Sequence, residues 1–216
     1  MMRERHLRYL AALLIIGLAF YTVSSASTIL SYALADLSVS AANAPQTYAP
    51  FVDQPTVAYL ARARMLQLAA SSDPAQRADD IKDLLAQTPA DGHMWLELAK
   101  AQAAQQVPPD RLVKPLAMSS LTGPNEGRVM AERVLFMAPL WNNLPADSRR
   151  GISSDLLGGW GSMSMPQKRY IGDVLKSAPE EEKHQIAAGL LLAGKEGTAL
   201  AKTLDLLAAP AESKAK

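Results

Sequence analysis

The chain has 216 residues, of which 49% are apolar and only 6% aromatic, and it carries 22 basic against 21 acidic residues and no cysteine. This balance leaves no net excess of the basic residues with which proteins neutralise several phosphates, so we expect no nucleic-acid partner. The lack of cysteine excludes disulfides, thiolate zinc sites, thiol nucleophiles and a lipid-anchored N-terminal cysteine. The length accommodates one or two small domains with appendages.

A long uncharged segment, residues 9–35, follows the basic N-terminus of residues 1–8. A helix over this segment rises about 40 Å, which is enough to cross a hydrocarbon core of about 30 Å. Arg3, Arg5 and Arg8 precede it, so the positive-inside rule places residues 1–8 in the cytoplasm. The sequence therefore predicts a single-pass protein of the inner (cytoplasmic) membrane, with the rest of the chain in the periplasm.

A cleaved secretory signal is the alternative for the same segment. Its most apolar part is only the stretch Tyr9–Val23, and Ser24–Ala26 offers small residues suited to a signal peptidase. Ile29 and Leu34 continue the apolar run past that point, and a mature N-terminus would have to expose or bury them elsewhere. We therefore favour an uncleaved signal-anchor that holds the chain in the bilayer.

Small polar residues recur along the membrane segment at helical spacing: Ser24, Ser27, Thr28 and Ser31. Such a stripe suits close packing on another transmembrane helix, which makes these four residues candidates for a partner interface. The alternative is that each hydroxyl bonds to a carbonyl of its own helix.

Residues 36–55 carry three prolines and no apolar period, so they predict an extended linker. From residue 56 the apolar residues recur with a period near 3.6, and no stretch shows the alternation typical of a strand. The predicted fold class is therefore all-α. The expected apolar helix faces are Val57, Leu60, Ala61 and Leu68; Ile81, Leu84 and Leu85; Trp95, Leu98 and Ala99; Leu112, Val113, Leu116 and Ala117; Met130, Val134 and Met137; Ile152, Leu156 and Trp160; Tyr170, Ile171, Val174 and Leu175; Ile186, Leu190 and Leu191; and Leu200, Leu204 and Leu207.

The breaks between these segments repeat. Pro55, Pro89 and Pro124 recur at intervals of about 35 residues, and Pro89-Ala-Asp-Gly returns as Pro124-Asn-Glu-Gly. In this respect the chain resembles the tetratricopeptide family, whose unit is two antiparallel helices in about 34 residues. The best match is residues 92–125.

In that match Trp95, Leu98 and Ala99 stand like the Trp, Leu and small residue of the family's first helix, and Gly123-Pro124 closes the unit. The resemblance implies a short α-solenoid of antiparallel hairpins over residues 56–140. Departures from the family pattern, at Gln102, Arg111, Pro115 and Met118, leave an unrelated bundle of helical hairpins open. Residues 141–208 would add further helices or a cap, and residues 209–216 a flexible tail.

The sequence offers few residues for catalysis or metal binding. His93 and His184 are the two histidines of the exterior part, and there is no HExxH, GxSxG or phosphate-binding glycine loop. Met163 and Met165 could offer thioethers to Cu(I), but a third ligand such as His184 or Met137 would have to join them. Since core packing explains methionines more simply, we predict no catalytic residue, no cofactor and no metal.

Tryptophans are the other candidates for recognition, because they are enriched at binding hot spots. Trp95 shares a face with Leu98 and Ala99 and is expected in the core. Trp141 and Trp160 lie in segments rich in helix breakers, so we take them as candidates for an exposed partner interface.

These observations predict a non-enzymatic scaffold that is anchored in the membrane and uses its periplasmic helical domain to bind a protein partner, with no small-molecule substrate inferred. The alternative is an accessory subunit of a membrane enzyme or transporter, held mainly through its transmembrane helix. The alanine-rich style and the topology resemble small accessory proteins of Gram-negative envelopes, including those of polysaccharide synthesis or export.

Overall fold

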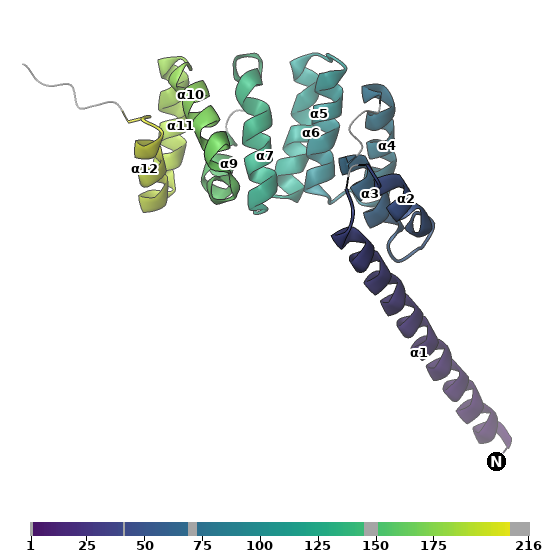
Figure 1. The fold of residues 1–216 in the computed structure, drawn as a ribbon. Coiled ribbons are helices and arrows are strands. Elements are labelled where there is room, and N and C mark those ends of the chain that lie inside the picture. The colour runs from purple at the N-terminus through teal and green to yellow at the C-terminus, as the bar shows by residue number, and fades with distance from the viewer. Residues whose placement is uncertain (1, 41, 69–72, 145–150, 208–216) are drawn as a thin grey trace, which may run out of the picture. The chain divides into compact units, whose positions relative to one another are not determined.

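The computed structural model describes residues 2–40, 42–68, 73–144 and 151–207, and the side chains of residues 2–8 and 141–143 are outside this description. These residues form 11 α-helices and three 3-10 helices, and they contain no strand (Figure 1). The prediction of an all-α chain is therefore confirmed. The chain divides into two compact units, Met1–Asp73 and Pro74–Lys216.

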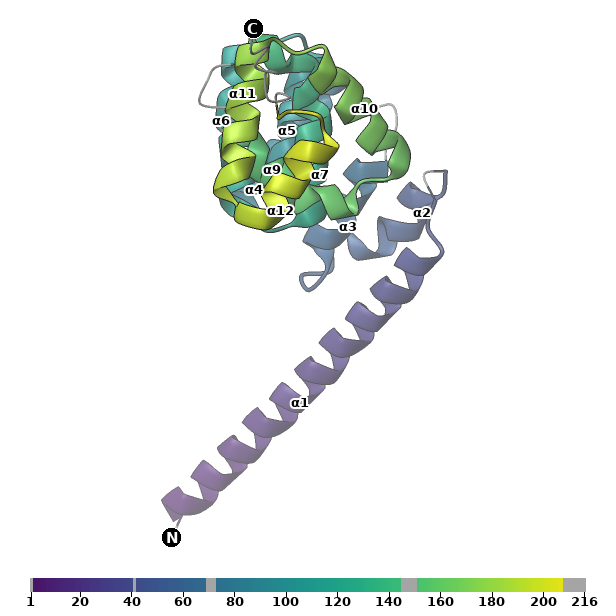
Figure 2. The same ribbon diagram turned by 90° about the vertical axis from the view of Figure 1, so that its left-hand side faces the viewer.

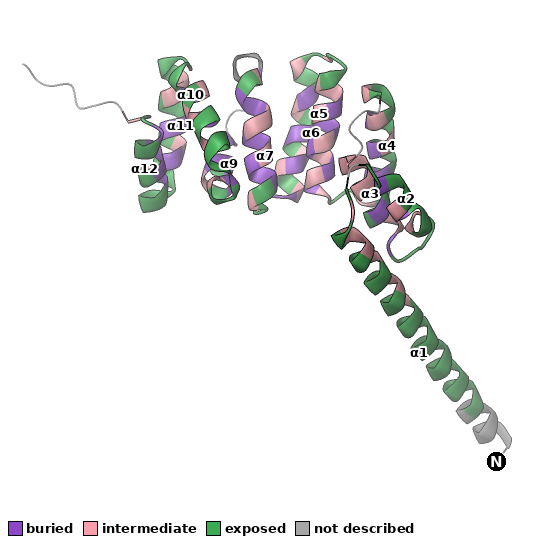
Figure 3. Cartoon of the chain, in the orientation of Figure 1, coloured by how far each residue is buried: buried purple, intermediate pink, exposed green. Residues whose placement is uncertain are grey.

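Helix α1 (Met2–Leu37) contains the uncharged segment and is continuous through it. Among the described residues it is the one helix long and apolar enough to cross a membrane, over Tyr9–Leu37. From Tyr9 onward its large apolar side chains are exposed, apart from Tyr32 (Figure 3); Phe20, for example, is 76% exposed and Val23 is 70% exposed. An apolar surface of this extent must either be covered by lipid or be removed by cleavage of the segment. The length and composition of the helix fit both a signal-anchor and a signal sequence.

The rest of the first unit consists of α2 (Ala44–Tyr48), the 3-10 helix η1 (Ala49–Phe51) and α3 (Ala58–Leu68). The expectation of an extended linker over residues 36–55 is therefore wrong for residues 44–51, which are helical. Ala44 and Tyr48 are one helical turn apart and both are buried, together with Ala61 of α3. Pro45 is accommodated in the first turn of α2, where a backbone N–H is not needed.

Aromatic side chains join the end of α1 to this small core. The ring centroid of Tyr32 lies 5.7 Å from that of Tyr48 and 5.6 Å from that of Phe51. The Tyr48 hydroxyl donates to the Asp36 carboxylate, which also accepts from Arg64 Nε at 3.2 Å. Burial and the hydrogen bond to Asp36 raise the pKa of Tyr48 to about 12, so the hydroxyl remains a donor at neutral pH.

The second unit contains eight of the α-helices and two 3-10 helices in the order α4 (Pro74–Gln87), α5 (Gly92–Ala104), α6 (Pro109–Thr122), α7 (Gly127–Met137), η2 (Ala138–Asn143), α9 (Ile152–Gly159), η3 (Trp160–Ser162), α10 (Met165–Lys176), α11 (Glu180–Leu192) and α12 (Gly194–Thr203). Each predicted apolar face falls within or directly beside one helix, from α3 onward.

Consecutive helices of this unit pack in pairs, among them α4 with α5, α5 with α6, α7 with α9 and α11 with α12. One apolar core runs through the unit from Leu96 of α5 to Leu206 beyond α12. Figure 2 views the row of helices from its C-terminal end, with α11 and α12 toward the viewer and α10 to one side. Only Ile171 and Leu175 of α10 are buried, so this helix is attached by a narrow apolar face.

The repeated Pro-x-x-Gly motif occupies equivalent places in the structure. Gly92 begins α5 and Gly127 begins α7. A Cβ on Gly92 would lie 2.7 Å from the backbone nitrogen of Gly123, which follows α6, and one on Gly127 would lie 3.1 Å from the carbonyl oxygen of Gly158 in α9. Both glycines therefore permit the start of one helix to approach the end of another, which explains why the motif recurs with the helix pairs.

Candidate functional site

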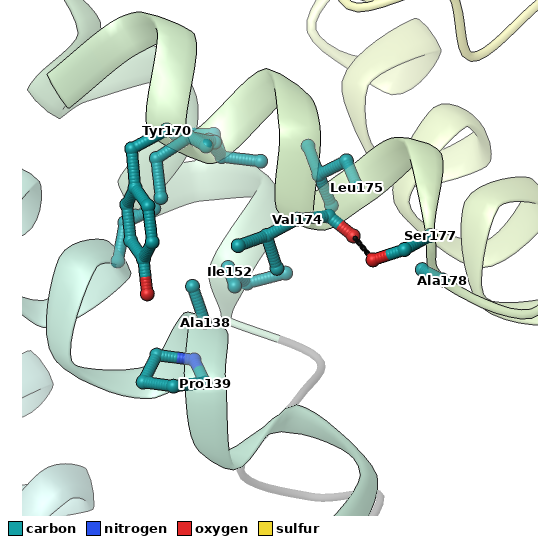
Figure 4. A pocket seen from close by; sticks show the side chains of 11 residues that line it. Ala138, Pro139, Ile152, Tyr170, Val174, Leu175, Ser177 and Ala178 are labelled. Atoms are coloured by element: carbon teal, nitrogen blue, oxygen red, sulfur yellow. Dashed lines mark hydrogen bonds between the residues drawn. The ribbon is translucent and has the colours of Figure 1, made fainter. Parts of the chain in front are cut away.

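An apolar pocket lies between the second half of α7, the start of α9 and helix α10 (Figure 4). Its volume is about 260 Å³. It is lined by Val134, Ala138, Pro139, Ile152, Leu156, Tyr170, Ile171, Val174, Leu175, Ser177 and Ala178.

The sequence forms the walls of this pocket through two short amphipathic helices. Ile152 and Leu156 are one turn apart on α9, and Ile171 and Leu175 are one turn apart on α10. A capping box begins α10: the Ser164 hydroxyl accepts from the backbone of Gln167, and the Gln167 side chain accepts from the backbone N–H of Ser164 at 2.7 Å. This fixed start orients the apolar face of α10 toward α7 and α9.

Two side-chain hydroxyls, those of Tyr170 and Ser177, are the polar side-chain groups among the lining residues. Ser177 Oγ donates to the carbonyl of Val174 at 2.8 Å, so it is bound to its own helix. The Tyr170 ring extends over the pocket, with its hydroxyl toward Ala138 and Pro139 in the view of Figure 4. With no carboxylate, imidazole or amine in the lining, the pocket suits an apolar guest rather than acid–base chemistry.

A second groove, lined by four charged residues, borders the other side of α10, between this helix, η3 and the end of α12. Its volume is about 420 Å³. Trp160 lines it, with the Lys168 ammonium 5.3 Å above the centre of the indole ring. Trp160, which the sequence marks as a candidate interface residue, is thus half-buried and packs against the main core.

The other candidate residues do not converge on one place. Ser24, Ser27 and Ser31 are exposed along α1, while the Thr28 hydroxyl donates to the Ser24 carbonyl at 3.1 Å. For Thr28 the structure thus shows the alternative in which the hydroxyl bonds to a carbonyl of its own helix. The backbone of Trp141 belongs to η2, but its side chain lies outside the described part of the chain.

The methionine pair is divided between two environments. Met163 is buried in the main core at 5% exposure, whereas Met165 is 65% exposed at the start of α10. Of the proposed third ligands, Met137 is buried and His184 is exposed. Two thioethers in such different surroundings do not form a copper site as the chain is folded.

Trp95 differs from its expected place in the core. It is only partly buried, and its indole N–H donates to the Pro89 carbonyl at 2.8 Å, across the turn that precedes α5. Leu98 and Ala99 are buried as expected. Trp95 therefore closes the Pro-x-x-Gly turn that precedes α5.

A charged cluster that sequence reasoning missed joins α4, α5 and α7. His93, Glu97 and Glu132 place one ligand atom each within 4.8 Å of one another, which is close enough for a metal ion. All four carboxylate oxygens, however, face a cation of the chain. Lys100 Nζ contacts Glu97 at 2.8 Å and Glu132 at 3.0 Å, Arg77 contacts Glu97 at 2.7 Å, and Arg128 contacts Glu132 at 3.1 Å.

Electrostatics therefore disfavour a metal ion at this cluster, since two carboxylates already face three permanent cations. Burial raises the pKa of Glu97, but the neighbouring Lys100 and Arg77 outweigh it, and the pKa of this carboxyl lies below its ordinary value of 4.5. The pKa of Glu132 is lowered in the same way against its burial, with Lys100 as the main cause. The signal in the sequence was the spacing of His93, Glu97 and Lys100 on one face of α5, but Glu132 is remote in the chain.

We expect the Glu97→Gln variant to be less stable than the wild type near neutral pH, and the difference to shrink in acid. The folded chain holds the pKa of Glu97 below 4.5, so the unfolded chain binds more protons in acid. The contribution of Glu97 to the free energy of unfolding is therefore complete above pH 4.5 and is lost as the pH falls through the lowered pKa. Urea titrations of both proteins over a series of pH values measure this difference. A constant difference across the series would contradict it.

A second missed feature is the buried guanidinium of Arg133 in α7. Its side chain is 1% exposed and binds Asp155 of α9 with two contacts, Nη2 to Oδ1 at 2.6 Å and Nε to Oδ2 at 2.9 Å. Arg133 Nη1 also donates to the Ser119 carbonyl at 3.0 Å, and the Ser119 hydroxyl donates to the Gly92 carbonyl at 2.7 Å. This Arg133 network links α5, α6, α7 and α9, the last two of which carry walls of the apolar pocket.

Comparisons with models of protein families, with characterised proteins and with solved structures found no match for this chain. No family is therefore identified, and the tetratricopeptide resemblance remains a prediction from the repeat pattern. The structure itself shows an all-α chain with an N-terminal apolar helix and packed consecutive helix pairs.

Proposed function

We propose that this protein is a non-enzymatic scaffold of the cell envelope that binds a protein partner through the apolar pocket between α7, α9 and α10. Helix α1 would hold it in the inner membrane as an uncleaved single span, with the N-terminus in the cytoplasm and the helical unit in the periplasm. An anchor of this kind raises the local concentration of the helical unit beside a membrane complex.

The observation that carries this proposal is the character of the pocket. Its volume of about 260 Å³ lies below the range of roughly 300–1,000 Å³ typical of sites for drug-sized molecules and cofactors. The space suits one or two apolar side chains of another protein. Tyr170, which is 43% exposed at the rim, offers the amphipathic ring that is frequent at hot spots of protein interfaces.

The form of the helical unit supports the same function. Stacked helix pairs build an extended core and leave one surface free for a partner without supplying chemistry. The Pro-x-x-Gly motif at the starts of α5 and α7 supports a degenerate tetratricopeptide-like solenoid as the finer description of this part of the chain. Polysaccharide synthesis or export is the envelope process that this type of accessory protein suggests.

A second candidate function is that of an accessory subunit held through its transmembrane helix. It is supported by the exposed side chains of Ser24, Ser27 and Ser31, which interrupt the otherwise apolar surface of α1. Small polar residues permit close contact between helices in lipid. In this case the periplasmic helices would only cover the partner.

The Ala178→Phe variant tests the scaffold proposal. The larger side chain occupies the pocket from its edge, and we expect partner affinity to fall by about 2 kcal/mol, or roughly thirtyfold in Kd, because an anchor side chain loses its place. The measurement is the amount of partner that co-purifies with the full-length chain after gentle detergent extraction and chemical cross-linking.

Ala86→Phe is the matched control, since Ala86 is exposed on α4 and lies outside the pocket. A chimera with an unrelated membrane helix in place of residues 9–35 separates the two candidate functions. Retention of the partner by the chimera, together with its loss from Ala178→Phe, supports the scaffold. Loss from the chimera with full retention by Ala178→Phe would reject it in favour of the accessory subunit.

A further inference from the structure

The groove on the second side of α10 carries an excess of positive charge that no ion pair among the described residues neutralises. Lys168, Arg169 and Lys176 line it against a single carboxylate, Asp173. None of the three cations makes an ion pair within 4.0 Å with a described residue. The cations of the charged cluster on α4, α5 and α7 show the opposite behaviour, because each of them faces a carboxylate.

The arrangement of these cations favours an elongated anion. Lys168, Gly172 and Lys176 follow one another at intervals of four residues and therefore form one row along α10. The Cα atoms of the two lysines lie about 12 Å apart along the helix axis. Gly172 has no side chain, and a Cβ at this position would meet nothing within 4 Å. The middle of the row is thus open, so a ligand can approach the helix between the two cations.

Two classes of elongated anion could fit this row: an anionic sugar polymer and an acidic peptide segment. The indole of Trp160 decides between them. A sugar polymer would be expected to use this ring as a stacking surface. One face of the indole, however, already lies beneath the Lys168 ammonium at 5.3 Å, and Trp160 is half-buried against the main core. The ring therefore holds Lys168 in place through a cation–π contact, and a sugar could stack on that face only by displacing the Lys168 ammonium.

The groove also shares α10 with the apolar pocket. Tyr170, Ile171 and Val174 face the pocket, whereas Lys168, Arg169 and Lys176 line the groove. We propose that the groove binds an acidic segment of the same protein partner whose apolar side chain enters the pocket. The inference rests on the proposed function and adds the chemistry of the partner: carboxylates for the groove and an apolar anchor for the pocket.

The double variant Arg169→Glu/Lys176→Glu tests this inference. Its matched control is Arg111→Glu/Lys114→Glu, which changes the charge equally at two exposed residues of α6 that also have no ion pair with a described residue. The probes are a labelled amphipathic helical peptide with leucine on one face and glutamate on the other, the same peptide with glutamine for glutamate, and polygalacturonate. Full-length protein in detergent is titrated with each, and unfolding by urea verifies that both variants are folded.

We expect the glutamate peptide to bind the wild type and the control alike, to bind Arg169→Glu/Lys176→Glu about tenfold more weakly, and to lose affinity as salt is raised. A peptide with lysine in place of glutamate should bind the reversed variant better than it binds the wild type. Equal binding of the glutamate and glutamine peptides, or equal binding to both variants, would overturn the inference. So would a response to the charge reversal from polygalacturonate alone, which would assign the groove to an anionic glycan.

Failure of this inference is distinguishable from failure of the proposed function. If Ala178→Phe releases the partner from membranes while Arg169→Glu/Lys176→Glu retains it, the pocket binds the partner and the groove does not. If neither variant releases it, both proposals fall.

Discussion

Replacement of Arg133 by methionine is expected to lower the free energy of unfolding by about 3–5 kcal/mol. The loss is large because Asp155, of which only 6% of the side chain is exposed, would lose its only counter-charge among the described residues. Burial already raises the pKa of Asp155, so the carboxyl would have to take up a proton or remain as an unpaired charge. The Ser119 carbonyl would lose a hydrogen bond in the same step. Urea unfolding of the purified protein, followed by far-ultraviolet circular dichroism, measures the change.

The double variant Arg133→Met/Asp155→Leu distinguishes the cost of an unpaired charge from the value of the pair. Removal of both charges replaces a buried ion pair by apolar side chains, so we expect most of the lost stability to return. As a surface control, Lys82→Ala should change the free energy of unfolding by less than about 0.5 kcal/mol, because Lys82 and Asp79 are both more than half exposed. A double variant as unstable as Arg133→Met would show that the guanidinium itself is required.

Introduction of a methyl group at Gly159 is expected to destabilise the protein by about 3 kcal/mol. A Cβ at this position would lie 2.4 Å from the backbone nitrogen of Ala131 and 2.8 Å from its Cα. These atoms belong to the backbone of α7 and cannot turn aside as a flexible side chain would, so α7 and α9 must separate. The measurement is the urea midpoint of Gly159→Ala against the wild type.

Gly172→Ala is the control for this substitution, because its Cβ would meet no atom within 4 Å in the middle of α10. There we expect stability to be unchanged or to rise by up to about 1 kcal/mol, since alanine favours a helix over glycine. Equal losses at the two positions would show that the contact between α7 and α9 does not limit stability. Both Gly159→Ala and Arg133→Met also displace a wall of the apolar pocket and should weaken partner binding.

Several features of this chain follow from its local sequence. The uncharged segment 9–35 forms one continuous helix, and the apolar faces from α3 to α12 occur where the period near 3.6 predicts them. The repeated Pro-x-x-Gly motif marks the starts of α5 and α7. Such features depend on residues within one or two helical turns of each other, so the sequence contains the information directly.

The candidate site could be predicted only in part. Trp160 was marked from its breaker-rich surroundings and borders the groove beside α10, whereas the stripe on α1 remains a prediction. The apolar residues of α7, α9 and α10 were predicted as helix faces. Their periodicity does not predict that α10 packs through only two buried residues and leaves a pocket beside it. That depends on how closely three helices approach.

The sequence by itself determined the helices, the apolar segment near the N-terminus and the lack of cysteine chemistry. The tertiary structure alone decided which polar residues are buried and which cations have no ion pair among the described residues. Asp155 lies 22 residues after Arg133. In sequence Arg133 is an ordinary helical cation, and likewise Ala44 and Tyr48 belong to a stretch predicted as linker. Burial and pairing arise from contacts between segments remote in the chain, and the free energy of such contacts is fixed only when the helices have packed.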